Sequence, residues 1–117
     1  MVIGMIAVTS LTAGRSSGNT VSGLNPADFD TTLNGKKVEL VTLTNGRGME
    51  VCLTNYGGRI VSISVPDKNG KATDVVLGYD NIRQYADTLN TPSDFGSSVG
   101  RYANRIKNAR INVGGKV

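Results

Sequence analysis

The chain has 117 residues, of which 38% are hydrophobic and 19% charged, and its formal net charge is +4. It contains no histidine and one cysteine. Within these residues this excludes imidazole catalysis, thiol–histidine catalysis, an intrachain disulfide and a cysteine-based zinc site. The length predicts one domain or part of one, and the composition is too apolar for a disordered chain of high net charge.

The positive charge is concentrated near the carboxyl end. Residues 1–100 contain eight Lys/Arg and all nine Asp/Glu, whereas residues 101–117 contain five Lys/Arg and no acid. This end is therefore either a local anion- or polyol-binding patch or a segment whose acidic partners lie elsewhere. Nucleic-acid sites interleave basic side chains with exposed aromatic ones. Only Tyr102 interrupts this run, so we expect no nucleic-acid partner.

The amino end has features of an export signal. Residues 1–13 (MVIGMIAVTSLTA) are apolar and uncharged, but they are shorter than the about 20 residues that span a bilayer. Their length and small-residue end suit the apolar region of a secretory signal, although the basic residues that normally precede it are absent. Residues 11–14 resemble a lipoprotein cleavage box with Gly14 in place of the lipidated cysteine. Because glycine has no thiol, lipid cannot be attached there.

A stretch rich in Gly, Ser, Asn and Thr occupies residues 15–25, which is typical of a flexible linker. We therefore assign residues 1–23 to a degenerate or truncated export signal with its linker, and residues 24–117 to the folded part. The expected location is the periplasm of a bacterium, and no stable membrane anchor is expected. An apolar first strand, a mis-assigned start codon and a cytoplasmic location are the alternatives.

From residue 37 onward the sequence alternates with period two. Strands are predicted over 37–44 and 49–54, joined by a Gly-rich turn at 45–48, which is typical of a β-hairpin. Cys52 lies inside the second strand, where a small packed side chain is far more common than a reactive thiol. A second hairpin is predicted from a strand at 60–65 through a turn at 66–71 to a short strand at 73–77.

The remaining part predicts one short helix and a last strand. Asp80 is expected to cap a helix through 82–86, with a loop over 88–94 after it. Residues 106–113 alternate again and predict a strand that leads into a turn at 114–116. Long helical periodicity and βαβ units are absent. The fold class is therefore all-β, with antiparallel strands packed as a sandwich or barrel. Since the last turn has no partner strand, we expect a fragment of a larger sheet protein.

Residues 100–106 (GRYANRI) carry the most distinctive chemistry. Arginine supplies a planar fork of donors and asparagine supplies both a donor and an acceptor, so the adjacent Asn104 and Arg105 would suit vicinal hydroxyl groups. Neighbours in a strand point to opposite faces, so both reach one ligand only where the backbone bends or forms a loop. The alternative is that Arg101 and Arg105 pair with carboxylates, with Asp74, Asp80 and Asp94 as candidates.

Five blocks of the chain resemble the aldose 1-epimerase family, also called galactose mutarotases. They are residues 48–51 (GMEV), 54–61 (TNYGGRIV), 65–70 (VPDKNG), 74–79 (DVVLGY) and 99–106 (VGRYANRI). Their order and spacing fit from about Leu24 to the last residue. The resemblance implies a large antiparallel β-sandwich with one short helix, of which this chain supplies roughly the first third.

The resemblance also implies a reaction, the interconversion of α and β anomers of hexoses such as galactose and glucose. In the family a histidine protonates the ring oxygen while a glutamate removes the proton of the anomeric hydroxyl, and neither a cofactor nor a metal is needed. The family's sugar-binding Asn-Arg pair matches Asn104 and Arg105. Arg101 matches the motif, but we do not predict it as a ligand.

Both catalytic residues are expected beyond Val117, since the chain has no histidine and neither Glu39 nor Glu50 matches a catalytic position. The 117 residues alone are therefore expected to be inactive. One alternative is a non-catalytic β-sandwich module that binds carbohydrate or another protein. Another is a related epimerase that acts on a phosphorylated hexose.

Overall fold

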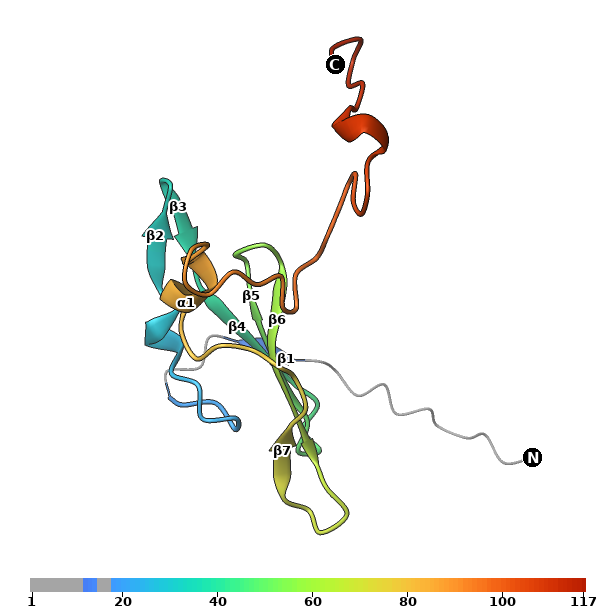
Figure 1. Cartoon of the computed structure of the whole chain (residues 1–117). Coiled ribbons are helices and arrows are strands. Elements are labelled where there is room, and N and C mark those ends of the chain that lie inside the picture. The colour runs from blue at the N-terminus through green and yellow to red at the C-terminus, as the bar shows by residue number, and fades with distance from the viewer. Residues whose placement is uncertain (1–11, 15–17) are drawn as a thin grey trace, which may run out of the picture.

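The computed structural model describes residues 12–14 and 18–117. Its main feature is a five-stranded antiparallel sheet in the order β1-β4-β5-β6-β7, beside a two-stranded β2-β3 hairpin (Figure 1). The strands are β1 (Thr12–Gly14), β2 (Thr31–Leu33), β3 (Lys36–Val38), β4 (Leu40–Thr44), β5 (Glu50–Thr54), β6 (Arg59–Pro66) and β7 (Ala72–Asp74). The helices are the α-helix α1 (Ile82–Ala86) and the 3₁₀ turns η1 (Pro26–Asp28) and η2 (Lys107–Ala109). The prediction of an all-β chain with one short α-helix is confirmed, and closure into a sandwich stays a prediction.

Both predicted hairpins form because their turns carry side chains that bond the local backbone. In the β4–β5 turn, the Asn45 Oδ1 accepts the N–H groups of Arg47 and Met49 at 2.8 and 3.1 Å. In the β6–β7 turn, the Asp67 Oδ1 accepts the N–H groups of Asn69 and Lys71 at 2.7 and 2.8 Å. Such bonds let Asn and Asp close a turn without help from distant residues.

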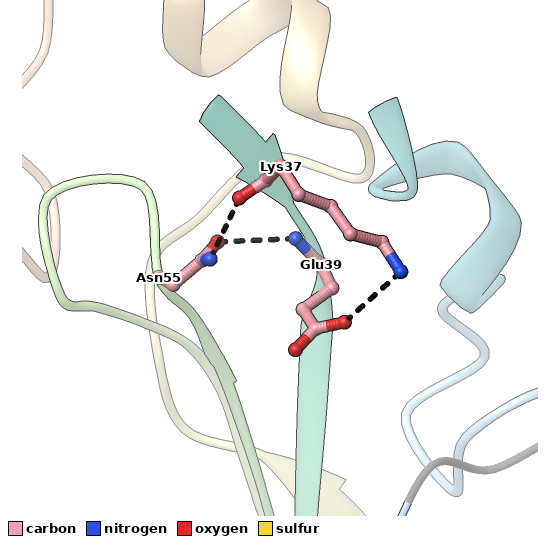
Figure 2. A network of polar contacts seen from close by, with 3 residues as sticks. All are labelled: Lys37, Glu39 and Asn55. Atoms are coloured by element: carbon pink, nitrogen blue, oxygen red, sulfur yellow. Dashed lines mark hydrogen bonds and ion pairs between the residues drawn. The ribbon is translucent and has the colours of Figure 1, made fainter. Parts of the chain in front are cut away.

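The strand predicted over 37–44 is interrupted at Glu39, where β3 ends and β4 begins (Figure 2). The Asn55 Nδ2 donates to the Lys37 carbonyl at 2.9 Å, and its Oδ1 accepts the Glu39 N–H at 3.0 Å. The Lys37 Nζ lies 3.7 Å from the Glu39 Oε2. One side-chain amide thus supplies the donor and acceptor that a neighbouring strand would offer, and β3 is left to pair with β2.

Two boundaries differ from the prediction because of single polar side chains. The strand predicted over 73–77 ends at Asp74, whose Oδ1 accepts the Ile63 and Val76 N–H groups at 3.1 and 3.0 Å. The helix is capped by Asn81 and not by Asp80: the Asn81 Oδ1 accepts the Gln84 N–H at 3.1 Å.

The prediction of a strand over 106–113 is wrong. The segment contains η2, and Asn108 and Ala109 both have positive φ, which interrupts any extended run. Only the turn after it forms, as an isolated bridge between Val113 and Lys116. Alternation makes a strand only where a neighbouring strand accepts its backbone bonds, and no described strand lies beside this segment.

The apolar core lies where η1, β3 and α1 meet one face of the sheet. Its buried members are Leu24, Phe29, Val38, Leu40, Cys52, Val61, Ile82 and Tyr85. The same face of the sheet also buries polar side chains on β4, β5 and β6: Thr42, Glu50, Thr54, Ser62 and Ser64. The opposite face is more apolar, yet its residues are only partly buried; they include Val41, Leu43, Val51, Leu53 and Ile63.

Part of the amino end packs on the sheet. Strand β1 pairs with β4, with Ala13 opposite Leu43. Thr20 is buried, and the Val21 N–H donates to the buried Glu50 Oε1 at 2.7 Å. The proposed signal over 1–23 lies largely outside the described residues, and the boundary at residue 24 stays a prediction.

Candidate functional site

The two residues predicted to bind sugar lie on an exposed loop. Residues 101–106 belong to no strand, and Asn104 and Arg105 are both exposed. Asn104 has a φ of 65°, a left-handed conformation that asparagine tolerates better than most residues. The backbone is therefore not extended at Asn104, and a shared ligand for Asn104 and Arg105 stays a prediction.

The arginines of this loop make no recorded ion pair among the described residues. Asp74, one of the carboxylates considered as a partner, accepts backbone N–H groups of the sheet instead. Asn104 and Arg105 are neighbours in the sequence, and their side chains make no hydrogen bond with the rest of residues 18–117 in the structure.

The segment just before this loop is docked on the start of β6. The Ile60 N–H donates to the Gly96 carbonyl at 3.0 Å, and the Ser98 N–H donates to the Gly57 carbonyl at 3.1 Å. The Ser98 Oγ donates to the Gly58 carbonyl at 2.7 Å. In Figure 1 the orange chain accordingly passes beside β6 before the red segment leaves the sheet.

Arg59 lies at the centre of this contact, and it is 9% exposed. Its Nη1 donates to the Ser93 carbonyl at 3.0 Å and to the Phe95 carbonyl at 3.5 Å. Its guanidinium carbon is 5.7 Å from the ring centre of Tyr56 and 5.2 Å from that of Tyr85, within the range of cation–π attraction.

Tyr85 connects this cluster to the helix. Its hydroxyl oxygen accepts the Tyr79 N–H at 2.9 Å, and its ring meets that of Tyr79 edge-on at 5.1 Å. Burial raises the pKa of the Tyr85 phenol above its ordinary value of 10.0. The hydroxyl group therefore remains protonated at neutral pH and serves a structural role.

Sequence reasoning did not single out the Arg59 cluster, although Arg59 lies inside the block at 54–61. An arginine at the start of a strand, directly after Tyr-Gly-Gly, was the only local sign. Among the described residues, no group of three or more His, Cys, Asp or Glu side chains could hold a metal ion. No helix in this described part is long and apolar enough to cross a membrane.

Comparison with known proteins identifies relatives of this chain. The family model described as aldose 1-epimerase matches residues 39–117. A protein of Arthroderma benhamiae named "Probable aldose 1-epimerase" is 36% identical over 101 residues, which are 86% of this chain and 23% of that protein.

Bacterial and mammalian relatives give the same result. The aldose 1-epimerase of Escherichia coli is 35% identical over 82 residues, which cover 70% of this chain and 23% of the relative. The galactose mutarotase of Mus musculus is 41% identical over 68 residues, which cover 58% and 19%. The chain matches less than a quarter of each of these relatives' length. Because the family model covers more than half of the chain and includes the GRYANRI loop, the chain belongs to the aldose 1-epimerase family.

Proposed function

We propose that the chain is the amino-terminal segment of an aldose 1-epimerase that interconverts the α and β anomers of hexoses such as galactose and glucose. The family match over residues 39–117, which includes the VGRYANRI block, carries this proposal. The reaction opens the sugar ring, allows rotation about C1–C2 and closes the ring on the other face. It requires a general acid and a general base and no cofactor.

In this proposal Asn104 and Arg105 bind the sugar. Arg105 donates to hydroxyl oxygens, and the Asn104 amide donates to one hydroxyl and accepts from another. Both side chains are exposed on a loop that bends at Asn104, which supports a shared ligand. Their task is to hold the ring in place while the acid and base act.

The catalytic histidine and glutamate are proposed to lie outside these 117 residues. Neither glutamate of the chain suits the role of base. Glu39 contacts Lys37 at the break between β3 and β4. Glu50 is buried and accepts the Val21 N–H. Neither carboxylate belongs to the loop that carries Asn104. We therefore expect the α and β anomers to interconvert at their spontaneous rate in the presence of this chain alone.

Polarimetry tests this expectation directly. Fresh α-D-galactose is dissolved with the purified chain, with buffer alone and with the Escherichia coli relative as the active reference. The rotation should decay at the buffer rate with the chain. A faster decay that scales with chain concentration would show that a catalytic pair is present within these residues.

The binding role is tested in the complete protein encoded by the reading frame. Arg105→Ala should raise KM for galactose at least about tenfold, since it removes charge-assisted hydrogen bonds to the sugar. Arg47→Ala, at an exposed position in the β4–β5 turn, is the matched control. Unchanged affinity and turnover in Arg105→Ala would remove Arg105 from the site.

The enzyme and the non-catalytic binding module differ in the residues that the reading frame encodes after position 117. A His-Gly-Gly segment and a late glutamate are expected there for the enzyme. A non-catalytic module has neither, and its complete product would not accelerate the change in rotation; a carbohydrate-binding module would still bind galactose, whereas a protein-binding module would not.

We also propose that residues 1–23 direct export in a bacterium. A fusion of this segment to an alkaline phosphatase that is active only after export should give activity. A fusion that starts at residue 24 serves as the control. Equal activity of the two fusions would favour the cytoplasmic location.

A further inference from the structure

Arg59 is an arginine buried without a carboxylate partner among the described residues. Burying a charge is costly unless other groups replace its water. Here the carbonyl oxygens of Ser93 and Phe95 accept from Nη1 and the faces of Tyr56 and Tyr85 flank the guanidinium, whereas the Arg59 Nε is buried without a hydrogen-bond partner among the described residues. If that loop left β6, the guanidinium would lose both of these carbonyl partners, and the loop in turn gains part of its contact with β6 from the guanidinium.

The backbone contacts around Arg59 leave little freedom in how the loop docks. A Cβ at Gly96 would overlap the Ile60 carbonyl oxygen, and a Cβ at Gly58 would lie 3.1 Å from the Ser98 Oγ. Close approach of this kind is possible only because glycines stand at the contact. The hydrogen bonds of the Arg59 side chain and the backbone contacts of residues 96–98 thus hold the segment 93–98 at both of its ends. We call the contact made by the Arg59 side chain the anchor.

Only Val99 and Gly100 separate this anchored segment from Arg101. We propose that Arg59 is a positioning residue of the sugar site: by holding 93–98 on β6, it fixes the point from which the Asn104–Arg105 loop leaves the sheet. This proposal rests on the proposed function for the role of the loop, whereas the anchor itself is a property of residues 57–98. A fixed departure point reduces the conformational entropy that the binding loop loses when a ligand orders it.

The anchor is tested by hydrogen exchange on the 117-residue chain. Arg59→Met keeps the apolar stem and removes the guanidinium, Arg59→Lys keeps the charge, and Arg83→Met, at an exposed arginine of α1, is the control. In Arg59→Met the Ile60 and Ser98 amides should exchange at least about tenfold faster, while the amides of the β4–β5 ladder stay within about twofold. Arg59→Lys should restore part of the protection, and Arg83→Met should match the unaltered chain.

Two results of the exchange experiment would overturn the anchor. In the first, the Ile60 and Ser98 amides keep their protection in Arg59→Met. In the second, all amides of the sheet lose protection together, which would make Arg59 a residue needed for the fold as a whole.

A kinetic measurement tests positioning as distinct from folding. In the complete epimerase, Arg59→Met should raise KM for galactose at least about fivefold with kcat within about twofold, because the binding loop is displaced and the acid and base are not. A merely structural role would lower the active fraction, and hence the apparent kcat, at unchanged KM; that result would overturn the proposal. If the unaltered complete protein does not epimerise galactose, the proposed function fails, whereas the exchange experiment still decides the anchor.

Discussion

The single cysteine lies in a polar part of the buried sheet face. Cys52 is fully buried, and its Sγ lies 3.8 Å from the Glu50 Oε1. Burial, followed by the negative charge of Glu50, raises the pKa of the Cys52 thiol from 9.0 to about 11. Since only the thiolate is nucleophilic, the environment of Cys52 makes the side chain inert, in agreement with its predicted packing role.

Cys52 should therefore react very slowly with Ellman's reagent in the folded chain. A rise of the pKa from 9.0 to about 11 lowers the thiolate fraction at pH 8 about 100-fold, and burial blocks access in addition. The rate is compared with that of the same chain unfolded in denaturant. Similar rates in the two states would mean that β5 opens readily or that the thiol is not shielded.

The side chain of Asn55 offers a second test on a single residue. Asn55→Ala removes the two hydrogen bonds that hold Lys37 and Glu39 at the break between β3 and β4. Because the site is exposed, water replaces part of the loss, and the free energy of unfolding should fall by about 1 kcal/mol.

Urea denaturation measures this loss, with Asn69→Ala as the control. Asn69 is exposed in the β6–β7 turn, and its side chain makes no recorded hydrogen bond within residues 18–117. If the two variants are equally stable, the Asn55 amide does not hold the break.

At the scale of elements, the sequence predicted the parts whose causes are local. The hairpin turns depend on Asn45 and Asp67, which bond backbone groups two and four residues away. The break at Glu39 depends on a side chain 16 residues further along the chain, so alternation alone could not place it. The strand expected over 106–113 failed for a related reason, because alternation does not show whether a partner strand is present.

The close approach of the loop at 93–98 to β6 leads to a prediction about two glycine substitutions. Gly96 and Gly70 have φ values of +67° and +81°, so alanine at either position carries a similar conformational cost of about 1–2 kcal/mol. Only at Gly96 would the new Cβ also overlap the Ile60 carbonyl oxygen, whereas it meets nothing at Gly70.

Gly96→Ala should therefore be less stable than Gly70→Ala in urea denaturation. It should also lose the protection of the Ile60 amide, which donates to the Gly96 carbonyl. Equal stability of the two variants, with the Ile60 amide still protected, would show that the loop does not approach β6 so closely.

At the scale of the whole molecule, the sheet is a base from which the proposed binding loop extends. The sequence could nominate Asn104 and Arg105 only through the family motif, since no composition or periodicity marks them as ligands. It could not reveal Arg59, because the carbonyls that receive its hydrogen bonds lie 34 and 36 residues further along. The partly buried apolar face of β4, β5 and β6 suits the second layer of the predicted sandwich, because a sheet with such a face requires a cover.

The contacts divide the carboxyl half of the chain at Ser98. Residues 93–98 are bonded to β6, and Thr91 Oγ1 donates to the Gln84 carbonyl in α1. No hydrogen bond or ion pair is recorded between residues 99–117 and residues 18–98.

A chain truncated after Ser98 should therefore keep its free energy of unfolding within about 0.5 kcal/mol. A chain truncated after Asp87 loses the whole docked loop and should be at least about 2 kcal/mol less stable. Urea denaturation followed by circular dichroism measures both, and a large loss on truncation after Ser98 would mean that the proposed binding loop itself packs on the sheet.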